Sequence, residues 1–404
     1  MKKIAVIGIG SAGILSLCHF MFYLREYQIT SIYDPAMPAV GVGESTNPFF
    51  FDSINAGLGI GHYDEFIKNQ NIDATIKHSI FYKNWRGEDF HNPLFGNGNH
   101  SAIHFNAHKF QNFALNRLRS IWGDRFKEIK GSVESVENIP YGCLVNVDSI
   151  DYDFDYVIDC RGFPKDYTNY TIVDLPINHC LVHNTPEIND WGYTLHQATP
   201  DGWMFGIPLS TRTSYGYLFN DKITSIDLAR KNFASTINIP IEKLDNTEYQ
   251  FTAYYANTIL DGRIIKNGNQ AVFFEPMFAN SLWLYSFISR LAVDHIEHGY
   301  DQSNMNYYFY KKVLEIHDLI CYYYQGGSNY DTDFWKYAMN YSKNTLKNSL
   351  FFKELDHKFS FMNKTDCYVD IKSFYSTESM LTIDQYLNYN SWPVRRDSNP
   401  RPTA

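Results

Sequence analysis

The sequence predicts an α/β fold that opens with a Rossmann-like unit. Three observations carry this prediction: an apolar run at residues 4–7, a Gly-x-Gly-x-x-Gly spacing at residues 8–13 that leads into an apolar helical pattern, and a second apolar run at 29–34 that ends in an acid. Strand, glycine turn, helix and strand in this order are typical of a βαβ unit. With 404 residues, 44% hydrophobic and 20% charged, the chain can bury a large core.

The glycines of this unit suit a dinucleotide. Gly8 permits the tight turn, Gly10 lets the backbone approach a pyrophosphate, and Gly13 lets the helix pack on the strand. Asp34, 21 residues after Gly13, is placed to accept hydrogen bonds from ribose hydroxyls. The first 22 residues also imitate a secretory signal, but the glycines break that apolar run. No other segment is apolar enough to suggest a membrane span.

Composition and charge exclude several other classes. A net charge of −9 without a Lys/Arg cluster argues against binding nucleic acid or an anionic membrane surface. The six cysteines include no CxxC pair, so we expect neither a metal site nor a disulfide framework, and a cytoplasmic location. Aromatic residues make up 17% of the chain, which suits the binding of a flat ligand, although a Tyr-rich core explains it equally well.

Three later segments have glycines or caps where a ligand could approach. Residues 155–164 form a strand-like run that ends at Asp159 and Gly162, and residues 267–292 contain a glycine, a short apolar run and a long helical pattern. A buried strand with a turn and an ordinary capped helix are the alternatives. The segment 41–48, GVGESTNP, has more glycines and hydroxyls than a short loop needs, although Thr46 or Asn47 could simply cap a helix.

Taken together, these segments resemble the flavin-dependent halogenases, the family that includes the tryptophan halogenases. The resemblance runs in the same order from residue 4 to about residue 290 and continues weakly through 333–335, and GxGEST is its most specific motif. It is carried by GxGxxG at 8–13, GVGEST at 41–46, ATIKHSIFYKNW at 74–85, IDCRGF at 158–163, GWMFGIPL at 202–209 and GNQAVFFEP at 268–276.

The resemblance implies an FAD-binding, flavin monooxygenase-like fold with an interleaved β-sheet and a helical substrate lobe. Residues 1–300 would form the FAD-binding domain with interleaved substrate-side elements, and 301–385 the helical lobe. The polar, Pro-rich residues 393–404 are expected from their composition to be a disordered tail. In the family, the loop at 41–46, which we call the strap, lies over the isoalloxazine ring. The implied FAD-binding residues are Gly8, Gly10, Ser11, Ala12, Gly13, Asp34, Gly41, Gly43, Glu44, Ser45, Thr46, Asp159, Gly162, Gly268 and Pro276.

Lys77 is the implied catalytic residue, because the family uses one lysine between its flavin and substrate chambers. If residues 75–83 form one strand, Thr75, Lys77, Ser79 and Phe81 share a face. An ammonium there could donate a hydrogen bond to hypohalous acid or become a haloamine, and desolvation would tune its pKa for either role. Without the resemblance, a solvated lysine at a strand edge would be expected.

Two departures from the family pattern concern the substrate side. Residues 203–208, WMFGIP, have Phe205 where the WxWxIP motif has its second Trp, and Phe278 stands where the tryptophan halogenases have a Glu. In the family, halide is bound by backbone amides at the positions that Asn280 and Ser281 occupy here, so the resemblance implies a halide site at these two residues. The other implied substrate-side residues are Trp203, Ile207, Pro208 and His91.

The implied reaction uses reduced FAD, oxygen and chloride, bromide or iodide to make a hypohalous species that halogenates an electron-rich aromatic compound. A separate flavin reductase would supply reduced FAD, since no second Gly-rich βα unit for a nicotinamide coenzyme is present. A flavin-dependent aromatic hydroxylase, favoured by Phe205, and a non-catalytic flavin-binding homologue, suggested by Phe278, stay open. The arene, the preferred halide, the regioselectivity and a homo-oligomeric state are left open.

Hydrophobic patterning predicts the remaining elements. Residues 104–123 have the spacing of a helix, residues 125–160 alternate like strands, and residues 300–345 are helical by pattern.

Overall fold

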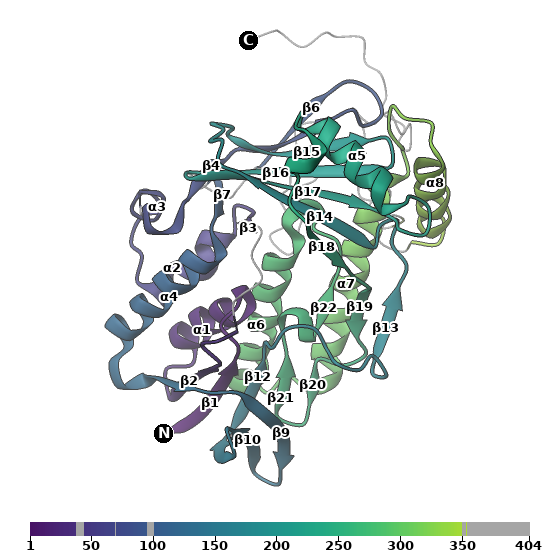
Figure 1. Cartoon of the computed structure of the whole chain (residues 1–404). Helices are drawn as coiled ribbons and strands as arrows, with labels where there is room; N and C mark the ends of the chain where they lie inside the picture. Colours follow the sequence, from purple (N-terminus) through teal and green to yellow (C-terminus); the bar gives the residue numbers. More distant parts are fainter. Residues whose placement is uncertain (38–43, 69, 95–100, 350–352, 354–404) are drawn as a thin grey trace, which may run out of the picture.

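The computed structural model describes residues 1–37, 44–68, 70–94, 101–349 and 353. Two large sheets lie one above the other, with α6 and α7 running between their levels along one side (Figure 1). The lower, six-stranded sheet is parallel around its centre, since β1 lies between β2 and β12 in parallel register. Its order is β20 (Leu260–Asp261), β21 (Ile264–Lys266), β12 (Tyr156–Asp159), β1 (Lys2–Ile7), β2 (Tyr27–Tyr33) and β8 (Phe126–Lys130).

The upper, seven-stranded sheet is antiparallel except where β5 pairs with β15. Its outer face packs on α5 through a cluster that includes Phe233, Tyr217 and Leu181. Its inner face faces the large core that it shares with the helices. The order is β18 (Thr247–Gln250), β14 (His179–Thr185), β17 (Arg212–Phe219), β16 (Gly202–Leu209), β15 (Tyr193–Thr199), β5 (Ser79–Lys83) and β6 (Phe90–Pro93).

Three small sheets and the helices complete the described fold. The sheets are β3 (Glu44–Ser45), β7 (Ala102–Phe105) and β4 (Thr75–Lys77); β11 (Ile150–Phe154), β10 (Gly142–Val147) and β9 (Val133–Ile139); and β13 (Tyr170–Val173), β19 (Ala253–Ala256) and β22 (Val272–Phe273). The helices are α1 (Ser11–Tyr23), α2 (Phe50–Leu58), α3 (Tyr63–Ile67), α4 (Ala107–Trp122), α5 (Ile226–Thr236), α6 (Asn280–His298), α7 (Gln302–Tyr324) and α8 (Asp333–Leu346), with single 3₁₀ turns at Gln70–Ile72, Gly123–Arg125, Ile241–Lys243, Gly268–Gln270 and Met277–Ala279.

The predicted βαβ unit is confirmed as β1, α1 and β2, and the strands expected in 125–160 are β8 to β12. The glycine turn has the predicted physical basis. Gly8 has φ +91, and a Cβ on Gly13 would lie 1.9 Å from the Gly8 carbonyl oxygen, so neither position accepts a side chain. The helical pattern at 300–345 corresponds to α7 and α8, and the tail at 393–404 lies outside the described residues.

Three local expectations need correction. The strand expected at 75–83 divides at His78, because the His78 N–H donates to the Gly192 carbonyl and its own carbonyl accepts from Leu94 N, so β4 and β5 enter different sheets. The helix expected at 104–123 begins only at Ala107, after β7, with the Asn106 side chain accepting from Lys109 N as its N-cap. The helix after the strap starts at Phe50, so neither Thr46 nor Asn47 caps it.

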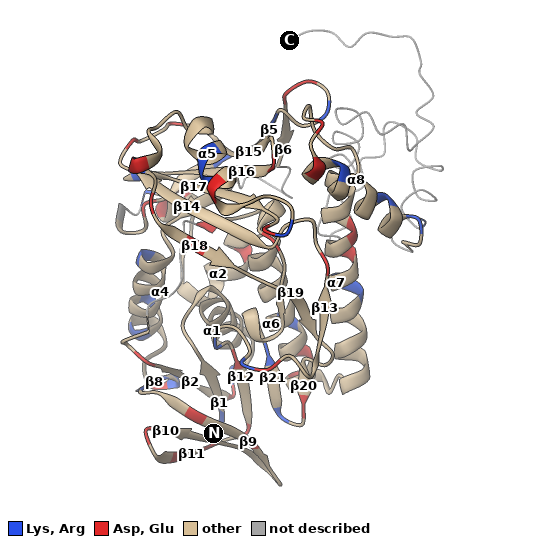
Figure 2. Ribbon diagram, turned by 45° about the vertical axis from the view of Figure 1, so that its right-hand side comes forward, with Lys and Arg blue, Asp and Glu red and all other residues tan. Residues whose placement is uncertain are grey.

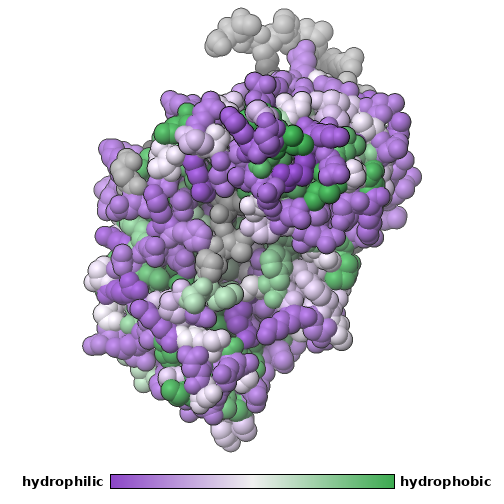
Figure 3. Space-filling model, viewed as in Figure 1, coloured by the Kyte–Doolittle hydropathy of each residue, from purple (hydrophilic) through white to green (hydrophobic). Residues whose placement is uncertain are grey.

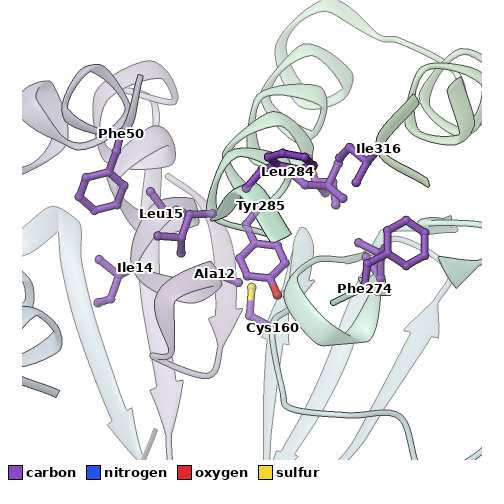
Figure 4. Close-up of a cluster of buried hydrophobic side chains, with 14 of the residues drawn as sticks. Ala12, Ile14, Leu15, Phe50, Cys160, Phe274, Leu284, Tyr285 and Ile316 are labelled. Carbon is purple, nitrogen blue, oxygen red and sulfur yellow. The ribbon is translucent and has the colours of Figure 1, made fainter. Parts of the chain in front are cut away.

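Many of the aromatic residues lie in the core. Trp85, Trp203 and Trp335 are fully buried, as are the consecutive tyrosines 322–324 of α7. Figure 4 shows the part of this core between α1 and α6, where Tyr285 points toward Cys160 beside Ala12. The Tyr-rich core therefore accounts for much of the aromatic content.

The surface is mixed in character. Lys and Arg are interspersed with Asp and Glu over the ribbon in Figure 2, and the face in Figure 3 is mostly hydrophilic with scattered hydrophobic groups. None of the helices in the described part of the chain has the length and apolarity that a membrane crossing requires.

Candidate functional site

Three glycine-containing segments that are far apart in the sequence meet at the carboxyl end of β1. A Cβ on Gly8 would lie 2.8 Å from the Cys160 carbonyl oxygen, and a Cβ on Gly268 would lie 2.7 Å from the Ala12 Cβ. The Asn267 N–H donates to the Asp159 carbonyl at 2.9 Å, which joins the third segment to the second. The structure therefore brings the three predicted cofactor segments together.

The same place leaves the backbone open where a ligand would approach. No atom of the described chain lies within 4 Å of a Cβ built on Gly10 or on Gly162. Gly10 is the N-cap of α1, where no side chain accepts from the free N–H groups of the first turn. Open backbone beside an uncapped helix start fits the diphosphate of a dinucleotide.

The two acids expected near the cofactor differ in their surroundings. Asp34 is half-buried directly after β2, the strand that pairs with β1, and its Oδ1 accepts from Ala36 N at 2.8 Å. The carboxylate of Asp159 instead forms a bidentate ion pair with Arg161. Arg161 Nε donates to Asp159 Oδ1 at 2.9 Å, and Arg161 Nη2 donates to Asp159 Oδ2 at 2.7 Å. Asp159 therefore orients Arg161 in the 159–162 turn.

Asn267 is a residue of this region that the sequence did not single out. Its side chain is fully buried, and Nδ2 lies 3.0 Å from each of Ser16 Oγ, the Tyr285 carbonyl oxygen and Ser289 Oγ. These contacts tie α1 to α6 beneath the glycine segments. The only signal in the sequence is an Asn before a Gly, which is typical of any turn.

The strap is described from Glu44 onward, so Gly41 and Gly43 lie outside the described residues. Burial raises the pKa of Glu44 to about 7, while the hydroxyl of Ser11 at the start of α1 lowers it. Thr46 holds the strap to β7: its Oγ1 donates to the Ile103 carbonyl and accepts from Ile103 N, each at 2.8 Å. Thr46 thus fixes the strap in place.

Lys77 lies at the end of β4 with 1% of its surface exposed. Its Nζ donates to Ser45 Oγ and to the Thr46 carbonyl oxygen, each at 2.9 Å, and both acceptors belong to the strap. Burial lowers the pKa of the ammonium to about 7. Both acceptors are neutral, so these contacts bring no opposite charge that would hold the pKa of the lysine at its usual value.

Hydroxyl groups and a histidine continue the contacts of Lys77 away from the strap. Ser45 Oγ lies 2.9 Å from Thr194 Oγ1, which lies 2.8 Å from His104 Nε2. His104 Nδ1 is 3.0 Å from Thr75 Oγ1, which donates to the Pro208 carbonyl oxygen at 2.6 Å. Of these residues, the sequence singled out only Ser45, Pro208 and, as a strand neighbour of Lys77, Thr75.

The buried histidines near Lys77 are neutral. Burial first, and then the charge of Lys77, holds the pKa of His104 well below its usual range and lowers that of His196 to about 3. The His196 ring on β15 packs 4.8 Å from the Trp203 ring, centroid to centroid. Of Lys77, His104 and His196, only the lysine can therefore carry a positive charge near neutral pH.

Trp203 and Phe205 lie on the inner face of β16, as does Ile207. A Cβ on Gly216, the cross-strand partner of Phe205, would lie 2.2 Å from the Phe205 ring, so that glycine leaves the space that the ring fills. Trp203 Nε1 donates to Tyr324 Oη at 2.8 Å. The aromatic pair of the 203–208 segment is therefore packed and fixed in orientation.

Glu275 lies inside the GNQAVFFEP motif, but the sequence did not predict a role for it in the site. It is fully buried, and its Oε1 accepts from Tyr324 Oη at 2.8 Å. Its Oε2 has no hydrogen-bond partner within the described part of the chain. Burial raises the pKa of Glu275 to about 8, so the carboxyl is largely protonated at neutral pH.

The segment expected to bind halide adopts an unusual backbone at the start of α6. Phe278 and Ala279 have φ of 67 and 55, which L residues rarely adopt. Pro276 precedes this turn, and its carbonyl accepts from Ala279 N at 3.2 Å. The Asn280 side chain turns back to the Glu275 and Met277 carbonyls, and no side chain caps the helix.

His91 is not brought together with the other substrate-side residues. It is exposed on β6, where its ring stacks on Phe81 with centroids 4.6 Å apart and its Nδ1 lies 2.9 Å from Ser79 Oγ. Phe81 belongs to the cluster on the outer face of the sheet, whereas Trp203 belongs to the core on the inner face. His91 therefore lies across the sheet from the aromatic pair.

Comparison with known proteins identifies the family of this chain. The family model described as tryptophan halogenase matches residues 3–108 and 95–368. Tryptophan 7-halogenase RebH of Lentzea aerocolonigenes is 20% identical over 383 residues, which covers 75% of this chain and 71% of RebH.

Solved structures of halogenases show the same fold. A tryptophan halogenase from Shewanella frigidimarina superposes with a TM-score of 0.80 at 15% identity, over 100% of this chain and 91% of that one. Xcc4156, a flavin-dependent halogenase from Xanthomonas campestris, has a TM-score of 0.76 at 18% identity, over 95% and 88% of the two chains. From the match along most of its length, the chain belongs to the tryptophan halogenase family of flavin-dependent enzymes.

Proposed function

We propose that the protein uses reduced FAD, oxygen and a halide to make a hypohalous species, and that Lys77 directs this species to an electron-rich aromatic substrate. The observation that carries the proposal is the environment of Lys77. Its amine is buried, its pKa is lowered to about 7, and both of its acceptors are neutral atoms of the strap. A lysine held in this way is available near neutral pH both as a hydrogen-bond donor and as a nucleophile.

FAD is assigned to the region where the three glycine segments meet. Gly10 and Gly162 leave the space that a diphosphate needs, and Asp34 would hold the ribose. Glu44 would face the ring from the strap, while the hydroxyl of its neighbour Ser45 is turned to Lys77 and Thr194. Reduced FAD, when bound, supplies the two electrons with which oxygen and halide become hypohalous acid. The tight positions Gly8, Ala12, Gly13 and Gly268 shape this site by packing against the chain itself.

The halide is assigned to the backbone amides of Asn280 and Ser281, at the uncapped start of the 19-residue helix α6. Lys77 would then either donate a hydrogen bond to the oxygen of hypohalous acid or take up the halogen as a haloamine with release of water. In either case the arene gains the halogen and loses a ring proton. Trp203 and Phe205 present the packed apolar surface that keeps the arene on its own side.

An aromatic hydroxylase is the second candidate. Phe205 in place of the family's Trp favours it, since the smaller ring without an indole N–H gives a weaker barrier between substrate and cofactor. This candidate predicts an oxygenated product that forms without halide. Phe278 at the position of the family's Glu suggests a third outcome, flavin binding without turnover.

A separate flavin reductase is the proposed source of reduced FAD, and a small aromatic compound is the proposed substrate. We further assign the protein to the cytoplasm, because Cys18, Cys143, Cys160, Cys180 and Cys321 are all free thiols.

The test is mass spectrometry of reactions that contain FAD, NADH, a generic flavin reductase, oxygen and each halide in turn, with a panel of phenols, indoles and anilines. Halogenated product that needs both the protein and halide supports the proposal. A product heavier by one oxygen without halide supports the hydroxylase. No product with any arene of the panel is the result expected of the non-catalytic homologue or of an enzyme with a narrow substrate range.

Two variants then test the lysine. Lys77→Met should abolish halogenation while flavin oxidation and peroxide release continue. Lys83→Met, which removes an exposed lysine six positions along the chain, should leave both unchanged. Halogenation by Lys77→Met at the rate of the unaltered protein contradicts the role assigned to Lys77.

A further inference from the structure

The register of the small sheet places polar side chains in one row beside Lys77. Strand β7 lies between β3 and β4, and His104 on β7 is the cross-strand partner of both Ser45 and Thr75. Thr194, from β15 of the seven-stranded sheet, closes the gap between Ser45 and His104 with contacts of 2.9 and 2.8 Å. Ser45, Thr194, His104 and Thr75 therefore form a continuous hydrogen-bonded chain, which we call the polar row.

The far end of the row fixes the direction of every hydrogen bond in it. The Pro208 carbonyl can only accept, so the Thr75 hydroxyl donates to it and must itself accept from His104 Nδ1–H. A neutral His104 with its proton on Nδ1 accepts at Nε2 from the Thr194 hydroxyl. Thr194 then accepts from the Ser45 hydroxyl, which leaves Ser45 a lone pair facing the Lys77 amine.

These hydrogen-bond directions determine which bonding positions of the Lys77 amine are occupied. Lys77 donates one N–H to Ser45 and a second to the Thr46 carbonyl, and neither partner can donate back. In the neutral amine the lone pair is left at the remaining position, and in the ammonium an N–H is left there. With respect to the residues that the structure describes, one position of the amine thus stays available in both protonation states.

We propose that His104 and Thr194 are positioning residues for halogen transfer: through Ser45 they keep one bonding position of the Lys77 amine open for the oxidised halide. The inference rests on the proposed function and deepens it. The row holds the amine and has no outlet for a proton at its far end, where the Pro208 carbonyl can only accept. A proton that left the amine could go only as far as His104 Nε2, where it would have to charge a fully buried ring. The low pKa of His104, caused by burial and by Lys77, agrees with a neutral ring in the row.

The polarity of the row can be tested without turnover. The protein labelled with ¹⁵N-histidine, with the His104 signals assigned by their loss in His104→Asn, reports the tautomer by NMR. The expected result between pH 6 and 9 is a neutral His104 that carries its proton on Nδ1. A proton on Nε2, or an imidazolium in this range, overturns the proposal whether or not the protein halogenates any arene.

The effect on the reaction is tested at Thr194. Thr194→Val removes the acceptor of the Ser45 hydroxyl, which can then turn and donate to the amine lone pair. It should lower kcat for halogenation by about 10²-fold, with KM for the arene and the rate of flavin oxidation unchanged. Thr194→Ser keeps the hydroxyl and should restore most of the rate.

Thr199→Val is the matched control, because Thr199 is a fully buried threonine of the same strand whose Oγ1 bonds Tyr217 Oη at 3.0 Å. It should leave halogenation unchanged. If Thr194→Val halogenates like the unaltered protein, or if Val and Ser are equally impaired, the positioning role is wrong. Absence of halogenation in the unaltered protein would instead count against the proposed function, and the NMR result would still decide the polarity of the row.

Discussion

Lys77 makes the stability of the fold depend on pH in a direction opposite to that of most lysines. Burial lowers its pKa from 10.5 to about 7, so the folded state holds a proton less tightly than the unfolded chain. The resulting cost is absent above pH 10.5, grows as the pH falls and is complete below about pH 7. One pKa unit corresponds to about 1.4 kcal/mol, so the whole cost is on the order of several kcal/mol.

Lys77→Met should therefore gain stability relative to the unaltered protein as the medium becomes more acidic, while it loses halogenation. Thermal unfolding of both proteins at pH 6, 8 and 10 measures the difference in Tm, which we expect to be largest at pH 6. A difference that does not change with pH would show that the ammonium is not buried in solution.

Glu275 produces the opposite dependence. Its pKa rises from 4.5 to about 8 on burial, so the folded state favours the protonated carboxyl, and stability is lost as the pH rises from about 4.5 through 8. Glu275→Gln retains a carbonyl oxygen for Tyr324 and removes the ionisation. Its Tm should match that of the unaltered protein near pH 4.5 and exceed it by several degrees at pH 8.5. Parallel Tm curves across this range would contradict a buried Glu275.

At the level of elements, α2 depends on a close approach to α1. A Cβ on Gly57 would lie 2.4 Å from the Cys18 carbonyl oxygen, so Gly57→Ala must push the two helices apart, at a cost of about 1–3 kcal/mol. Because α2 follows the strap directly, FAD binding should weaken as well. Gly61→Ala is the control, since no atom of the described chain lies within 4 Å of its Cβ position. Equal Tm values for the two variants would refute the close packing.

Which elements the sequence could predict depends on how local their causes are. The βαβ unit follows from glycine spacing within residues 8–13, and it is present as expected. The break at His78 could not be predicted, because it depends on backbone hydrogen bonds to Gly192 and Leu94. The importance of Glu275 was missed for the same reason, since Tyr324 and Trp203 reach it only in the folded chain.

In the molecule as a whole, Lys77 stands where the two large sheets are joined. Its acceptors lie on the strap, which follows the lower sheet's βαβ unit, while the polar row beside it reaches β15 and β16 of the upper sheet through Thr194 and Pro208. The contacts of Lys77 therefore reach both the strap, where we propose that the flavin binds, and β16, which carries Trp203 and Phe205. Halogen transfer within a single molecule is what this arrangement favours.

Two variants, one that should not bind FAD and one that lacks the lysine, test whether halogen transfer stays within one molecule. Gly10→Val should fold normally, because its φ of −61 and the open space around it admit a side chain, yet it should fail to bind FAD, as measured by flavin fluorescence. Lys77→Met should bind FAD and oxidise it without halogenating. A mixture of the two proteins should form no more product than Lys77→Met alone, since the oxidised halide made in one chain does not reach the lysine of the other. Product above that background would mean that hypohalous acid escapes into solution before Lys77 directs it, and would require the lysine to act on a freely diffusing oxidant.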